Sequence, residues 1–85
     1  MTKISTTYNR VYNDMFEQYA EVNETVTPRQ IANCKLHAAE AQYLESPSDE
    51  NHIEWIEAQV ELNKRQIESL EETLATILLK RNMLN

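Results

Sequence analysis

The chain has 85 residues, a net charge of −6 at pH 7 and no glycine. The absence of glycine disfavours phosphate-binding loops and hairpin-rich β folds, because both use glycine where the backbone needs positive φ or a close approach to a ligand. Fourteen Asp and Glu against eight Lys and Arg disfavour non-specific binding to nucleic acid or to anionic membranes, which requires a basic face.

A first helix is predicted over about residues 5–22. Its apolar residues recur at intervals of four and three, which places them on one face of a helix. They are Tyr8, Tyr12, Met15, Tyr19 and Val22. The favoured interpretation is a face that packs into a core, and the alternative is that its tyrosines stack on a ligand.

A second helix is predicted over about residues 28–45. Thr27 is suited to an N-cap, Pro28 to the first helical position and Gln30 to the return bond of a capping box. Pro47 follows the predicted end, and the residue before a proline resists helical ψ. Because this helix is apolar on two sides, we expect it to lie between the other two.

A third helix is predicted over about residues 49–83, roughly twice the length of the other two. Hydrophobic residues recur along it at intervals of three and four, which is the heptad pattern of a coiled coil. A hairpin of the first two helices can cover only about half of this stripe. We therefore expect the stripe to form an oligomer interface, made by Ile53, Ile56, Val60, Asn63, Ile67, Leu70, Leu74, Ile77, Leu78 and Leu84.

Two readings of this interface stay open. Asn63 stands at a heptad core position, where it either selects register and oligomer state or faces solvent beside the stripe. The alternative to an oligomer is a plain three-helix bundle. Trp55 and Leu62 lie off the stripe and are predicted to contact the first or second helix.

The third helix also carries an acidic row. Glu50, Glu54, Glu57 and Glu61 are spaced four, three and four apart, which predicts one solvent-facing line of carboxylates. Such a row could bind a basic protein partner or imitate nucleic-acid phosphates in a basic groove. A separate hypothesis is a small-molecule site, nucleotide-like in chemistry, at a subunit interface, for which the candidates are Tyr8, Tyr12, Arg29 and Lys35.

Little in the sequence indicates catalysis, a metal or a cofactor. Cys34, His37 and Glu40 are three residues apart in turn, yet a zinc site would need further ligands from another helix or subunit. A Cys34–His37 nucleophile pair in the middle of a helix would lack an oxyanion hole. We therefore predict no enzyme activity, no cofactor and no metal.

Together these patterns predict a single all-α domain spanning residues 1–85, with a helical hairpin packed on a long oligomerising helix. The expected function is non-catalytic binding, in which an acidic oligomer captures, inhibits or scaffolds a macromolecular partner, as phage-type inhibitors and assembly chaperones do. The single cysteine and the absence of an apolar signal segment predict a cytoplasmic protein, in the host cytoplasm if it is viral. No membrane contact is expected, and the acidic charge balance disfavours direct nucleic-acid binding.

Overall fold

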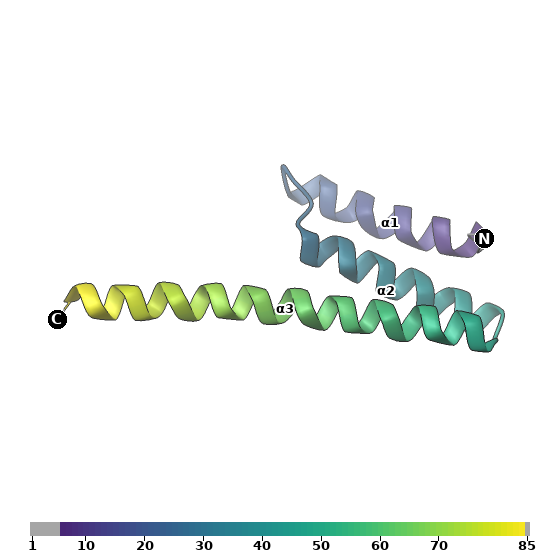
Figure 1. Ribbon diagram of the computed structural model, residues 1–85. Coiled ribbons are helices and arrows are strands. Elements are labelled where there is room, and N and C mark those ends of the chain that lie inside the picture. The colour runs from purple at the N-terminus through teal and green to yellow at the C-terminus, as the bar shows by residue number, and fades with distance from the viewer. Residues whose placement is uncertain (1–5, 85) are drawn as a thin grey trace.

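The computed structural model describes residues 6–84, which form three α-helices and no strand (Figure 1). Helix α1 spans Thr6–Val22, α2 spans Pro28–Glu45 and α3 spans Asp49–Leu84. The all-α prediction is confirmed, and the bounds differ from the predicted ones by one residue at most. None of the described helices is both long and apolar enough to cross a membrane.

The helices follow one another in alternating directions, with α2 in the middle (Figure 1). α1 packs on one side of α2, and the N-terminal half of α3 packs on the other. The Tyr19 hydroxyl accepts a 2.8 Å hydrogen bond from the Asn33 side-chain amide and so links α1 to α2. The predicted central position of the second helix is confirmed.

The start of α2 is held by the predicted capping box. The Thr27 hydroxyl accepts a 3.2 Å bond from the Gln30 backbone N–H, and the Thr27 N–H donates a 3.0 Å bond to the Gln30 side chain. Pro28 follows as the first helical residue, where its missing N–H removes no helical bond. Two of the unpaired donors at this helix end are therefore satisfied by the chain itself.

The start of α3 is capped in a related way. The Asn51 backbone N–H donates a 3.1 Å bond to the Ser48 hydroxyl, and the Asn51 side-chain amide donates a 2.7 Å bond to the Ser46 carbonyl. Acidic residues occupy the first turn of α3 and Arg81 its last turn, which is the distribution that the helix dipole favours.

The core between the helices is thin. Among the described residues the buried hydrophobic side chains are small except for one leucine: Ala32, Cys34, Ala38, Ala39, Ala58 and Leu62. Alanines let helix backbones approach closely, but they remove little apolar area from water. α1 contributes no buried residue, and Val22, which was predicted on its core face, is 78% exposed. That prediction is wrong because Val22 is the last residue of α1, at the end of its packing against α2.

The molecule is elongated, with extents of 57 × 29 × 20 Å. Its radius of gyration is 16.7 Å, whereas a compact chain of this length would have one of about 12 Å. The cause is α3, whose 36 residues extend about 54 Å, twice the reach of the hairpin. The C-terminal half of α3 therefore projects beyond α1 and α2 (Figure 1).

Candidate protein-interaction surfaces

The hydrophobic stripe of α3 is exposed to solvent along its whole described length. We call it the seam face, and it consists of Ile53, Ile56, Val60, Asn63, Ile67, Leu70, Leu74 and Ile77. Its apolar side chains are between 46% and 68% exposed. A contiguous apolar surface of this length is unusual on a soluble monomer and typical of an interaction site.

The hairpin packs on the opposite side of α3. This docking face consists of Trp55, Ala58 and Leu62, of which Ala58 and Leu62 are buried. The Trp55 ring lies 5.5 Å from the Tyr43 ring of α2, centroid to centroid. The predicted role of Trp55 and Leu62 in contacting the hairpin is confirmed.

The hairpin covers less of the seam face than the half that its length would allow. At about 100° per residue, the docking face and the seam face point in nearly opposite directions from the axis of α3. Ile53, Ile56 and Val60 lie beside the hairpin in sequence register, yet they are exposed. The hairpin uses the other side because Ala58 admits the alanine-rich α2 at close range.

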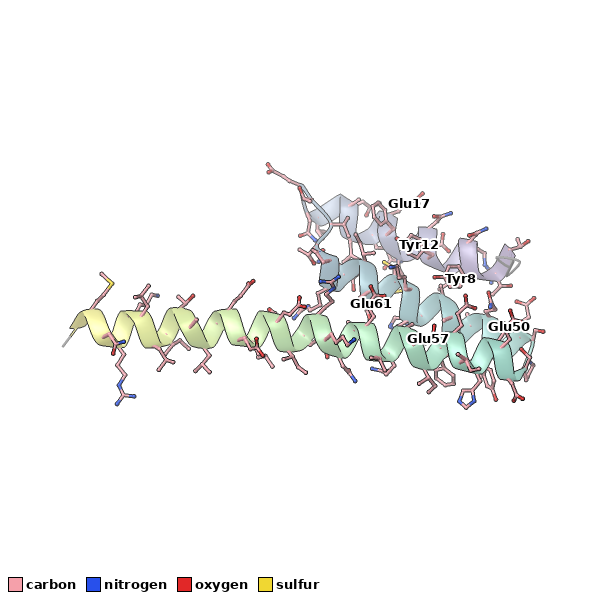
Figure 2. The ribbon with its side chains drawn as sticks, viewed as in Figure 1. Tyr8, Tyr12, Glu17, Glu50, Glu57 and Glu61 are labelled. Atoms are coloured by element: carbon pink, nitrogen blue, oxygen red, sulfur yellow. The ribbon has the colours of Figure 1, made fainter. Side chains whose placement is uncertain are left out.

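Beyond the hairpin, no other described part of the chain packs against α3. Every described side chain from Gln66 to Met83 is exposed, and Figure 2 shows them projecting from the C-terminal half of α3 on both sides of the ribbon. Leu78, Leu79 and Met83 widen the apolar surface there. The side chain of Leu84, another predicted interface residue, lies outside the described side chains.

Asn63 is exposed and accepts a 3.2 Å hydrogen bond from the Gln59 side-chain amide one turn earlier. It lies in line with the apolar residues of the seam face. In the single chain it therefore faces solvent, and a role in selecting register stays a prediction.

The acidic row is divided between exposed carboxylates and half-buried carboxylates that bond to α2. Glu50 and Glu57 are exposed, and Figure 2 shows them with Glu61 along the N-terminal half of α3. Glu54 accepts a 2.7 Å hydrogen bond from the Gln42 side chain of α2. Glu61 forms a 3.5 Å ion pair with Lys35. Half of the row thus fastens α3 to α2, which leaves two carboxylates available to a partner.

The small-molecule candidates lie in two places. Tyr8 and Lys35 line a cavity of about 160 Å³ together with Ala39, Glu54, Glu57, Ala58 and Glu61. Tyr12 stacks on Tyr8 at 6.3 Å between ring centroids. Figure 2 shows both tyrosines on α1, and Glu57 and Glu61 on the N-terminal half of α3. Arg29 instead lines a separate cavity at the start of α2, beside Arg65 and Glu68.

The environment of the tyrosine cavity is acidic. Burial, and then the negative charge of Glu54, raise the pKa of Tyr8 above its ordinary value. Since three glutamates surround Tyr8 and Lys35, an anionic ligand such as a nucleotide would meet repulsion there. A drug-sized ligand also needs a pocket of about 300–1,000 Å³, which is larger than this one.

A buried polar network was missed by sequence reasoning. Gln42 is buried, and its amide donates to the Asn51 side chain at 2.8 Å as well as to Glu54. One sequence signal was present, because Gln42 is a polar residue among the apolar rows of the second helix. The partners could not be found without the register of α2 against α3.

Cys34, His37 and Glu40 do not converge on one point. Cys34 is fully buried, and that burial raises the pKa of its thiol, whereas His37 is exposed. Within residues 6–83 no three His, Cys, Asp or Glu side chains lie close enough together to hold a metal ion. The His52 ring lies beside the Tyr43 ring, tilted by 38°, with the ring centroids 5.1 Å apart.

Comparison with protein-family models, with curated proteins and with solved structures finds no match to this chain.

Proposed function

We propose that this chain is a non-catalytic binding protein that oligomerises through the seam face of α3 and captures a macromolecular partner with the surface that the oligomer leaves exposed. The observation that carries the proposal is the exposure of this face along the whole helix while the hairpin occupies the opposite side. Burying a half-exposed leucine or isoleucine contributes on the order of 1 kcal/mol. Seven such apolar residues in one line favour association over a free monomer.

The acidic row suits a basic protein partner. Glu50 and Glu57 are exposed and belong to the N-terminal half of α3, which contains no Lys or Arg between residues 49 and 62. Carboxylates in this arrangement attract a basic surface and repel acidic ones, so they contribute specificity and association rate. Imitation of nucleic-acid phosphates is less well supported, because Glu54 and Glu61 are bonded within the chain.

The small-molecule alternative has weaker support. Its tyrosines meet in a cavity too small and too acidic for a nucleotide-like ligand, and Arg29 lines a different cavity. A protein contact surface therefore accounts better for the exposed groups.

The test is the mass of the untagged protein under native conditions. The parent chain should have a mass that is a multiple of 10.0 kDa, whereas Ile67→Asp and Leu70→Asp should have the single-chain mass, because a charge in an apolar interface is strongly destabilising. Ala75→Asp is the matched control, since residue 75 is exposed on α3 but off the seam face. It should leave the mass unchanged. A parent chain that is monomeric at all accessible concentrations would refute the proposal.

A further inference from the structure

We infer that the seam face is covered by a second copy of the chain, which lies antiparallel to the first along the full length of α3. This inference rests on the proposed function and adds the occupant, its direction and its register. In the complex the two hairpins lie at opposite ends. Each N-terminal half of α3 is then held between its own α2 and the C-terminal half of the partner copy's α3.

The direction follows first from Arg81, which stands in the heptad line four residues after Ile77. In a parallel pair each heptad residue faces its own counterpart, so two Arg81 side chains would meet in one interface layer. Like charges at such close range are strongly unfavourable. In the antiparallel pair, Arg81 faces Ile56 of the partner copy, near the exposed carboxylate of Glu57.

The register follows from the symmetry of the heptad spacing. Each heptad has two core positions, a and d, and the seam face begins with Ile53 at a. A two-fold axis between Ile67 and Leu70 places every a position of one chain opposite a d position of the other. The facing positions are 53 with 84, 56 with 81, 60 with 77, 63 with 74 and 67 with 70. Sliding the helices by one heptad keeps the matching. It leaves Ile53 and Ile56 uncovered in one direction and Arg81 and Leu84 in the other, so full overlap buries the most apolar surface.

The charge distribution favours the same direction. Residues 49–62 carry five carboxylates and no Lys or Arg, whereas residues 63–84 carry four Lys and Arg against three Glu. A parallel pair would place the two acidic halves side by side. An antiparallel pair places each acidic half beside the more basic half of its partner. It also brings Lys64 close to Glu71 of the other copy, on the same flank of the interface.

The exposed area is sufficient for such a pair. The chain has a solvent-accessible surface of 6711 Å², whereas a compact monomer of its mass would expose roughly 5,200 Å². The excess is about 1,500 Å² per chain, or about 3,000 Å² for two chains, which lies within the range of about 2,000–5,000 Å² that obligate homodimers bury. The hairpin does not obstruct this pairing, because it occupies the docking face.

Site-specific cross-linking tests the inference. In a Cys34→Ala background, Val60→Cys and Ile77→Cys each place one thiol on the seam face, at residues that are exposed in the single chain and so tolerate the change. A short bis-maleimide should join the two variants when they are mixed, because positions 60 and 77 face each other. Neither variant should cross-link to itself, since like positions lie about 25 Å apart along the interface.

Three other outcomes would refute the direction, the register or the association itself. Self-cross-linking of Val60→Cys would show a parallel pair, which refutes the inference and leaves the proposed function standing. A two-chain mass without the 60–77 product would refute the register. A single-chain mass for the Cys34→Ala parent in analytical ultracentrifugation, with helicity retained in circular dichroism, would refute the inference together with the proposed function.

Discussion

Gln42 is the residue on which the joint between α2 and α3 most depends. It is the one buried polar side chain found among the described residues, and its amide donates to both Asn51 and Glu54. Asn51 in turn donates to the Ser46 carbonyl in the connection between the two helices. A buried amide is tolerated only when it is bonded, so this group selects one register of α2 on α3, whereas alanine contacts would tolerate several.

Replacing Gln42 by Leu should lower the free energy of unfolding by about 1–2 kcal/mol, because Asn51 and Glu54 lose a donor in a partly buried position. The measurement is urea denaturation followed by circular dichroism. Gln18→Leu, at an exposed position of α1, is the control and should have little effect. Equal stabilities for the two variants would contradict the role assigned to Gln42.

At the scale of the elements, the predictions that rest on local signals succeed. The capping box at Thr27 and Gln30 and the middle position of the second helix are both confirmed. These features depend on neighbours in sequence, which the chain displays directly. Trp55 and Leu62 were predicted correctly to contact the hairpin. How little of the seam face the hairpin covers could not be predicted, because it depends on how closely Ala58 and the alanines of α2 approach.

The candidate interaction surfaces could likewise be predicted where they depend on local spacing, and not where they depend on tertiary packing. The seam residues could be listed from their spacing alone, and the structure places them on one exposed line. The acidic row could also be listed, but its split into free and bonded carboxylates could not. That split depends on Gln42 and Lys35 of α2, whose positions opposite α3 are a property of the tertiary packing.

Replacing Thr27 by Ala should destabilise the fold by about 0.5–2 kcal/mol, because the Gln30 N–H loses its side-chain acceptor. The thermal midpoint from circular dichroism at 222 nm measures the effect. Thr25→Ala removes the same group from an exposed position in the connection before α2 and should leave the midpoint unchanged. If both variants had the thermal midpoint of the parent chain, the stabilising role assigned to the Thr27 cap would be contradicted.

At the scale of the whole molecule, the elongated shape and the thin core are consistent with the proposed association. The buried side chains are mostly alanines, and half of the longest helix has no covering neighbour (Figure 1). A domain of this size is near the lower limit of what one core can stabilise. In the proposed oligomer, burial of the seam face would be a main source of stability and not an addition to a finished fold.

The thermal midpoint should therefore rise with protein concentration, because association stabilises the folded chain by mass action. For a two-chain complex each tenfold increase in concentration contributes about 1.4 kcal/mol. Calorimetry over a hundredfold range of concentration measures the shift, and Ile67→Asp should abolish it. A midpoint that is independent of concentration in the parent would contradict this dependence on association.

The unbroken course of α3 has a consequence for how the gene can change. α3 continues from the hairpin to its C-terminal end without proline or glycine. Each residue added or removed in its middle therefore rotates all later side chains about the helix axis by about 100°. A deletion of one residue between Asn63 and Ile67 would carry the distal apolar line out of alignment with the proximal one. Insertions of seven residues would nearly restore the alignment. The length of this segment can therefore change without misaligning the two lines only by close to a whole number of helical turns, such as about seven or eleven residues. The connections on either side of α2 are under no such constraint.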